Sequence, residues 1–145
     1  MMRVVAAIVG VCALVACAGG DGGPQVGDAR VGQPTGPNAA MYFTATGGGQ
    51  ADRLIGASTD FAESVELHET TTNDAGTVGM QAVDSLGLSA DGTMILEPGG
   101  YHLMLVGADA LEVGDTIEVT LTWEVAGAMT LEVEVVEPGD TLDDH

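Results

Sequence analysis

The chain contains very little positive charge. Its 145 residues include 22 Asp and Glu but only three Arg and no Lys, which gives a formal net charge of −19 at pH 7. Binding to nucleic acid requires Lys and Arg contacts with phosphate, so no nucleic-acid partner is expected. An anionic membrane surface would also repel the chain, and we interpret the acidity as a solubility feature rather than as a site for a cationic partner.

Cysteine is equally scarce and occurs only at positions 12 and 17. Arg3 precedes an apolar run of signal-peptide length, which is too short to remain as a helix across a bilayer. The run ends in Leu14-Val15-Ala16-Cys17, which resembles a bacterial lipobox, whose Cys becomes the lipidated first residue of the mature protein. We predict that residues 1–17 are a lipoprotein signal peptide and that Cys17 is lipidated. The alternative is an ordinary signal peptide that contains a Cys.

Removal of Cys12 with the signal peptide would leave the folded domain without a free thiol. That excludes a disulfide framework, a Cys-ligated zinc site, a thiol redox motif and a blue-copper site. The mature protein is then expected outside the cytoplasm, on the outer face of the bacterial cell membrane, in the periplasm or at the cell surface. Only the lipid would attach it, and the several chains of a bacterial lipoprotein bind more stably than one chain does.

The rest of the chain divides by composition. Residues 18–37 are rich in Gly and Pro, which predicts a flexible linker. Residues 38–138 are predicted to form one folded domain, and residues 139–145 a loose acidic tail. Aromatic residues make up only 3% of the chain, so the core must consist mainly of Val, Leu, Ile and Ala.

Apolar residues in the predicted domain recur at every second position. The longest such runs cover 117–125 and 131–135, where they alternate with Thr or Glu, and shorter runs occur at 65–68 and 102–105. Alternation of this kind, interrupted by Gly, Pro, Asn and Asp, is typical of half-buried antiparallel strands. The sequence therefore predicts an all-β domain, an antiparallel β-sandwich or small barrel.

One of the shorter runs holds a His and a Met that core packing does not explain. Leu103 and Leu105 are expected to face the core. Because neighbouring residues of a strand point to opposite faces, His102 and Met104 then lie side by side on the other face.

A second pair of candidates follows from the other short run. Val65 and Leu67 are expected to face the core, which turns His68 outward. A turn at residues 73–76 would bring the next strand back, so that Met80 lies beside His68. Two His and two Met would then converge on one site outside the core.

Two imidazoles and two thioethers form a donor set that suits Cu(I). Thioether sulfur is soft and uncharged, copper accepts imidazole, and neither ligand adds charge around a monovalent ion. Magnesium, calcium and manganese prefer oxygen, and zinc takes Cys, His or carboxylate rather than Met.

Taken singly, each candidate has an ordinary structural explanation. A His-x-Met triplet is common, and a Met in a strand more often packs than binds metal. By the same reasoning, Met41, Met94 and Met129 are expected in the core, and His145 in the solvated tail. The shared outward orientation of the four candidates is what favours a metal site.

The four candidates also follow a specific spacing. Met80 and His102 enclose 21 residues, and His102-Leu103-Met104 forms a His-x-Met triplet. Together with the flanking runs this resembles the PCuAC family of periplasmic copper chaperones, whose pattern is H-x10-M-x21-H-x-M. The resembling segments are Ala51–Ser58, Val65–Glu69, Leu96–Leu105 and Glu112–Thr116.

The resemblance implies a cupredoxin-like β-barrel that holds Cu(I) through His68, Met80, His102 and Met104. It implies delivery of copper to the binuclear copper centre of cytochrome c oxidase, with a Sco-type thiol protein as a candidate collaborator. We expect a monomer that is not an enzyme.

The spacing departs from the family pattern at one place, because His68 and Met80 enclose 11 residues rather than ten. The extra residue fits most simply in the turn between residues 72 and 77. A shift of strand register by one residue would instead turn Met80 to the other face of the sheet. The lipid anchor is a second departure from a freely soluble periplasmic form.

A different class of function is a metal-free, lipid-anchored β-sandwich that serves as an adhesion or scaffold module. Failure to bind copper would favour it. An enzyme is not expected, because the sequence has no Ser-His-Asp spacing, no thiol nucleophile and no phosphate-binding loop.

Overall fold

The computed structural model describes residues 23–137. The predicted signal peptide (1–17) with Cys17, the start of the predicted linker and the predicted tail (139–145) lie outside these residues. Within these residues the chain forms ten strands and no helix. This part of the chain therefore contains no helix that could cross a membrane. The strands are β1 (Gln25–Gly32), β2 (Asn38–Thr46), β3 (Asp52–Ser58), β4 (Ser64–Thr72), β5 (Val78–Ala82), β6 (Leu86–Leu88), β7 (Thr93–Leu96), β8 (Tyr101–Val106), β9 (Thr116–Trp123) and β10 (Gly127–Val136).

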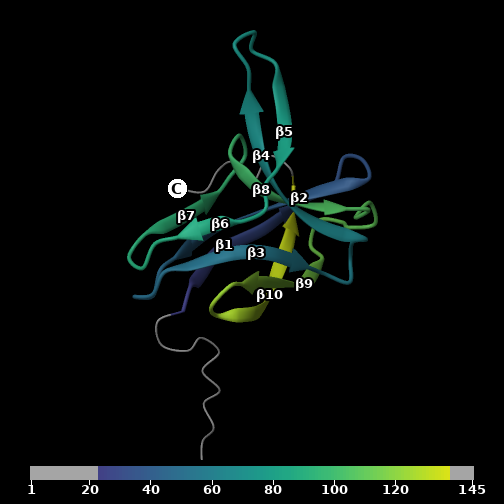
Figure 1. Cartoon of the computed structure of the whole chain (residues 1–145). Coiled ribbons are helices and arrows are strands. Elements are labelled where there is room, and N and C mark those ends of the chain that lie inside the picture. The colour runs from purple at the N-terminus through teal and green to yellow at the C-terminus, as the bar shows by residue number, and fades with distance from the viewer. Residues whose placement is uncertain (1–22, 138–145) are drawn as a thin grey trace, which may run out of the picture.

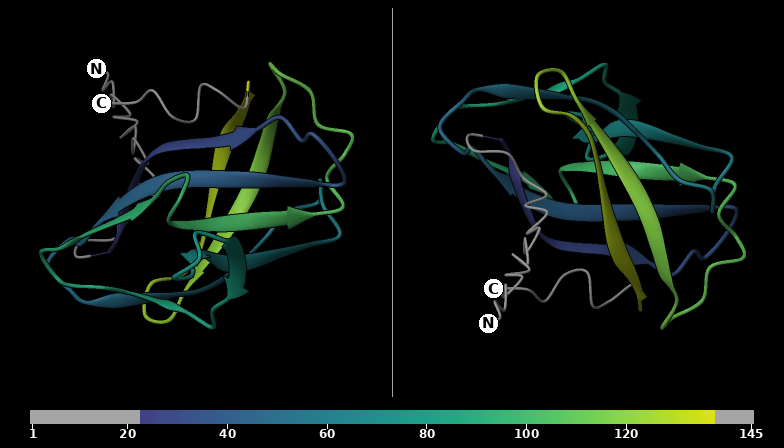
Figure 2. Two further views of the ribbon diagram at one scale, coloured as in Figure 1. Left: turned by 90° about the horizontal axis from the view of Figure 1, so that it is seen from above. Right: turned by 90° about the horizontal axis from the view of Figure 1, so that it is seen from below.

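All ten strands belong to one curled sheet, which confirms the all-β prediction. Their order is β5-β4-β8-β7-β2-β1-β10-β9-β3-β6, and β8 also pairs with β2. Neighbours are antiparallel except for β1 with β10 and β7 with β8. The strands wrap around a common interior, with β9 and β10 crossing β1 and β2 at a steep angle, and the β4–β5 hairpin projects from the body (Figures 1 and 2).

Strand β1 corrects the predicted domain boundary. Residues 25–32 fall in the segment predicted as a flexible linker, yet they pair with β2 on one side and with β10 on the other. Val31 is completely buried. The pairing is irregular between Gly27 and Arg30, where Asp28 has a φ of 55°. A short, Gly-containing segment has little strand preference of its own, so tertiary pairing decides its conformation.

The apolar residues that alternate in the predicted runs 65–68, 102–105, 117–123 and 131–135 are buried in the core or pack against it. Trp123, Phe43 and Met41 are the largest of the fully buried side chains. Met94 is buried as well and Met129 packs against the core, so the structure confirms the prediction for these three methionines.

The predicted strand 117–125 ends at Trp123, and Val125 lies in the turn to β10 with 56% of its surface exposed. Asp52, at the start of β3, holds this turn. Its Oδ1 accepts a hydrogen bond from the Val125 amide at 2.8 Å, and its Oδ2 accepts one from the Ala126 amide at 2.9 Å. The alternation of apolar and polar residues continues to Val125, although the strand ends at Trp123. Alternation is a property of neighbouring residues, so it does not show that the remote Asp52 carboxylate binds the amides of this turn.

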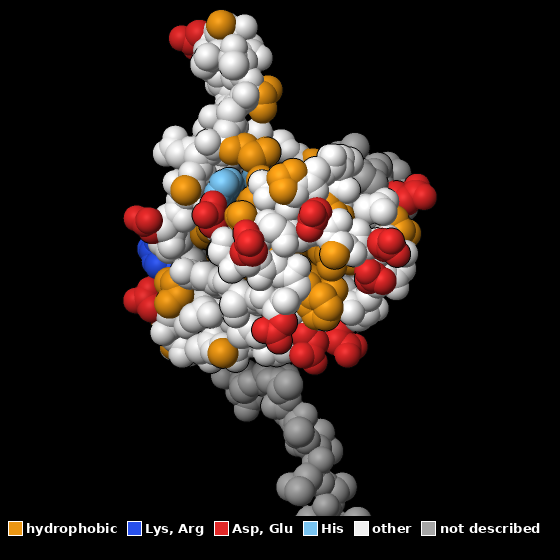
Figure 3. Space-filling model, turned by 90° about the vertical axis from the view of Figure 1, so that its right-hand side faces the viewer, with side chains coloured by type: hydrophobic (Ala, Val, Ile, Leu, Met, Phe, Trp, Pro, Cys, Tyr) orange, Lys and Arg blue, Asp and Glu red, His pale blue; other side chains and the backbone are white. Residues whose placement is uncertain are grey.

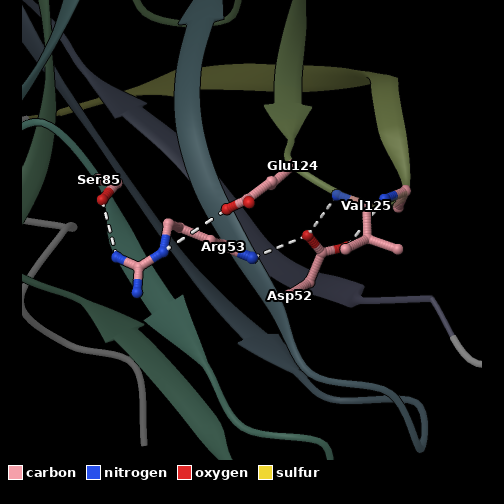
Figure 4. Close-up of polar contacts among 6 residues, drawn as sticks. Asp52, Arg53, Ser85, Glu124 and Val125 are labelled. Atoms are coloured by element: carbon pink, nitrogen blue, oxygen red, sulfur yellow. Dashed lines mark hydrogen bonds and ion pairs between the residues drawn. The ribbon is translucent and has the colours of Figure 1, made fainter.

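Asp52 and Arg53 together connect β3 to two other parts of the sheet (Figure 4). The Arg53 guanidinium donates a hydrogen bond to Ser85 at 2.8 Å and lies 3.7 Å from the Glu124 carboxylate. Burial raises the pKa of Asp52, but three backbone hydrogen bonds outweigh burial and hold this pKa below the ordinary aspartate value. The carboxylate is therefore ionised at neutral pH, the form that accepts all three bonds.

Asp52→Ala is expected to lower the free energy of unfolding by about 1 kcal/mol, because it removes the acceptor for exposed backbone amides of the β9–β10 turn. Asp52→Asn keeps one acceptor oxygen and is expected to lose less. Urea denaturation at neutral pH measures both variants. Unchanged stability of Asp52→Ala would show that water replaces the carboxylate at no loss.

Candidate metal site

The two candidate histidines lie on adjacent strands, directly opposite each other. Strands β4 and β8 pair antiparallel, with His68 opposite His102 and Leu67 opposite Leu103. The leucines are buried in the core, so both imidazoles stand on the other face of the sheet, as predicted. The ring centroids are 5.6 Å apart, with the rings edge to face at 61°.

His102 is more deeply covered than a residue on an outer face is expected to be. Only 2% of its surface is exposed. Tyr42 on β2 lies beside it, with 6.3 Å between ring centroids, and the Arg30 guanidinium lies 6.0 Å from the centre of the Tyr42 ring. At His102, therefore, the outer face of the sheet carries aromatic packing from the neighbouring strand β2.

Each imidazole uses one nitrogen for a hydrogen bond and leaves the other without a protein partner. His102 bonds to the backbone of Gly100, and because its Nε2 is buried and has no partner, Nδ1 makes that bond. His68 Nε2 lies 2.8 Å from Glu66 Oε2, and its Nδ1 is buried without a partner. A ligating histidine has this arrangement, in which a carbonyl or carboxylate fixes the tautomer and the other nitrogen keeps a lone pair for the metal.

The charge state of His102 also suits a ligand. Burial lowers the pKa of His102 below the ordinary histidine value, the neighbouring His68 lowers it further, and the bond to Gly100 opposes both effects. His102 is thus neutral at pH 7, and a metal binds neutral imidazole.

Met104 joins this pair from the same strand. It lies opposite Glu66 on β4 and opposite Ala40 on β2, on the face that carries both histidines. Its side chain is half-buried and, with Tyr42, lines a hollow of about 210 Å³ beside residues 32–40. The thioether is therefore next to the imidazoles and partly open to solvent.

Met80 lies on the same face but further out. It pairs with Thr70, two residues beyond His68, so the one-residue excess in spacing has not turned its side chain to the other face. The excess is absorbed by the loop of residues 73–77, where the Asn73 side chain accepts hydrogen bonds from the amides of Ala75 and Thr77. Met80 is 59% exposed and diagonal to His68, within the reach of a long side chain.

The structure thus brings His68, His102 and Met104 together and places Met80 at their open side. Among the described residues no three His, Cys, Asp or Glu side chains form a metal-binding group, so a metal here would depend on the thioethers. Sequence reasoning missed the roles of Glu66 and Tyr42. Position 66 shares a face with His68 and could have been found, whereas the contact of Tyr42 depends on the pairing of β2 with β8.

Comparison with known proteins gives the family. Residues 25–135 match the model of the family described as "Putative lipoprotein LpqE-like". The chain belongs to this family. It is 37% identical over 91 residues to "Putative lipoprotein Lxx21020" of Leifsonia xyli, a match that covers 62% of the chain and 54% of the relative. The chain thus spans about half the length of this curated relative.

Two solved structures place this LpqE-like chain among PCuAC domains. The copper-bound PCuAC domain from PmoF2 superposes with a TM-score of 0.66 at 26% identity, over 81% of this chain and 95% of that one. The solution structure of CuI-DR1885 from Deinococcus radiodurans gives 0.62 at 32% identity, over 84% and 82%. These similarities confirm the predicted resemblance to the PCuAC family and the cupredoxin-like β fold.

The metal-free LpqE-like protein is expected to lose stability as the pH falls below about 6.5, the ordinary histidine pKa. The unfolded chain binds a proton at His102 near that pH, but the folded chain binds it only at lower pH, so acid favours unfolding. Urea titrations at about pH 7.5 and about pH 5.5 measure the loss. His102→Phe keeps a ring that cannot be protonated and should lose less; equal losses would contradict the assignment.

Proposed function

We propose that this protein is an extracytoplasmic Cu(I) chaperone that binds copper through His68, His102, Met104 and Met80. The observation that carries the proposal is the pair of adjacent imidazoles, each with one nitrogen fixed by the protein and the other buried without a partner. A buried polar atom without a partner destabilises a fold by about 1–3 kcal/mol, so two of them on rings whose centroids are 5.6 Å apart support a ligand at this place.

The donor set favours Cu(I) over other ions. Two neutral imidazole nitrogens and two thioether sulfurs are soft or borderline donors, and they place no negative charge on a monovalent ion. The copper-bound PmoF2 domain and the Cu(I) form of DR1885 hold copper in the same fold, which supports copper as the metal here. Thioethers need no deprotonation and exchange readily, which suits a carrier that must release its metal.

We further propose that the acceptor is the copper centre of cytochrome c oxidase, with a Sco-type thiol protein as a candidate collaborator. The chain acts as a monomeric carrier and not as an enzyme. Lipidation of Cys17 would hold it at the outer face of the cell membrane, and the lipoprotein names of its family and of its relative support that location. Cys17 lies outside the described residues.

The metal-free adhesion or scaffold module remains the second candidate. It offers no reason for two partnerless imidazole nitrogens beside a thioether, so the geometry favours the copper carrier. A direct titration separates the two.

Cu(I) titration of residues 23–145 with a competing chelator should give one tight equivalent. His102→Ala/Met104→Leu should weaken binding by more than about 100-fold, because two ligands are lost. Met94→Leu, the same exchange at a buried core methionine, is the matched control and should bind normally. Absence of tight binding in the parent protein would retire the chaperone and leave the metal-free module.

Glu66→Gln should weaken Cu(I) binding by about tenfold, because the carboxylate that orients His68 becomes a neutral amide. The fold should be unaffected, since the Glu66 side chain is about half exposed. Glu69→Gln, on the same strand but the opposite face, is the control and should leave the dissociation constant unchanged. Equal effects of the two changes would indicate general charge rather than a contact with His68.

A further inference from the structure

The two sides of the candidate copper site differ in exposure. Toward β2, His102 is 2% exposed and lies beside Tyr42. Toward β5, the His68 side chain is 15% exposed and Met80 is 59% exposed. The face in Figure 3 shows histidine surface below the projecting hairpin, with hydrophobic side chains beside it. A protein that takes copper from this site therefore meets the β5 side first.

Strand β5 is the edge of the sheet, and its outer backbone groups are unpaired among the described residues. The bonds that flank the β4–β5 pairing run from Val83 N to Leu67 O and from Asn73 N to Thr77 O. In an antiparallel pair, hydrogen-bonded and non-hydrogen-bonded positions alternate, so Gly79 and Gln81 bond inward to β4. The N–H and C=O groups of Val78, Met80 and Ala82 therefore point outward.

This edge lacks the usual protection against strand pairing. Proteins blunt sheet edges with charged side chains, Pro, bulges or very short strands. Residues 75–83 contain no charged residue or Pro, although the chain carries a net charge of −19. The opposite edge, β6, has only three residues, and its Leu86 and Leu88 are buried. On β5, by contrast, Val78 and Met80 are 65% and 59% exposed.

We infer that the copper acceptor docks by adding an extended strand to the open edge of β5, and that Met80 is the first ligand it displaces. The inference rests on the proposed function. The residues with outward backbone groups also carry their side chains on the face of the histidines, so a strand bound there places its own side chains beside Met80, on the open side of His68. The partner is a protein that presents imidazole or thiol ligands on a strand without excess negative charge.

A second copy of this chain is a poor occupant of the edge. Two molecules of net charge −19 repel each other, and pairing β5 with β5 would bring two copper donors together with no acceptor. In the exchange, the bond from copper to the Met80 sulfur breaks as a bond to an acceptor nitrogen or sulfur forms. Copper remains Cu(I), and an acceptor thiol releases its proton to water.

Proline substitution tests the edge without disturbing the hairpin. Val78→Pro/Ala82→Pro removes two outward N–H donors and leaves the inward bonds of β5 intact. Val78→Thr/Ala82→Ser keeps both donors and is the matched control. The probe is the reduced, copper-free soluble fragment of cytochrome c oxidase that carries its copper site. The proline variant should transfer Cu(I) about tenfold more slowly than the parent, the control at the parental rate, and both should bind Cu(I) as the parent does.

Amide hydrogen exchange gives an independent readout of the docking. On addition of the oxidase fragment, exchange should slow at Val78, Met80 and Ala82 and stay unchanged at Gly79 and Gln81, which already bond to β4. If the proline variant loses Cu(I) binding, Val78→Pro alone, compared with Val78→Thr, replaces it.

Parental transfer rates in the proline variant, or protection around Met104 and its hollow instead of β5, would overturn the inference and leave the copper site intact. No transfer from the copper-loaded parent to the fragment would overturn it together with the choice of acceptor. Absence of tight Cu(I) binding in the parent is a different result, because it removes the proposed function itself.

Discussion

The register between β4 and β8 fixes the relation of His68 to His102, and the rest of the site depends on it. Both residues bond through their backbones to the facing strand, as the neighbouring bond from Thr70 N to Gly100 O indicates. The same register puts Leu67 opposite Leu103 in the core, so a slip of β4 by one residue would turn His68 toward the core and Leu67 away from it. Burial of the leucines thus holds the histidines in place.

The backbone of this strand pair also supplies the polar support of the rings. The Gly100 carbonyl accepts the Thr70 amide and bonds to His102, and Glu66, one pair along, bonds to His68. Both rings are thereby oriented before any ligand arrives. The two partnerless nitrogens reduce the stability of the empty fold, which the large apolar core of the remaining sheet offsets.

The site contains neutral donors in a very acidic protein. Its four candidate ligands are imidazole and thioether groups, which bind a metal as neutral donors, and Glu66 is the carboxylate that contacts one of them. The net charge of −19 opposes the close approach of two copies of the chain, whereas residues 75–83 along β5 carry no charge. A PCuAC-type fold does not by itself determine this distribution of charged and neutral side chains, and function depends on the particular side chains that a fold presents.

Local pattern was sufficient for much of the fold and part of the site. Alternation revealed β4, β8, β9 and β10 and their buried faces, because side-chain direction in a strand has a period of two, but it did not reveal β2, β3, β6 or β7. It therefore placed His102 and Met104 on one face, and the chemistry of His and Met indicated Cu(I) without a structure. Alternation could not reveal β1, a Gly-containing segment that is a strand only because it pairs with β2 and β10. It also could not reveal the end of β9, where the Asp52 carboxylate accepts a hydrogen bond from the Val125 amide of the turn.

The sequence by itself determined which residues alternate and which donors the chain can offer a metal. Tertiary structure decided how those residues meet. His102 is buried beside Tyr42, which is 60 positions away along the chain, and the position of Met80 beside Thr70 depends on how the loop after Asn73 closes. The reason is that hydrophobic periodicity is a property of neighbouring residues, whereas strand order and register are set by contacts between segments that are remote in the sequence.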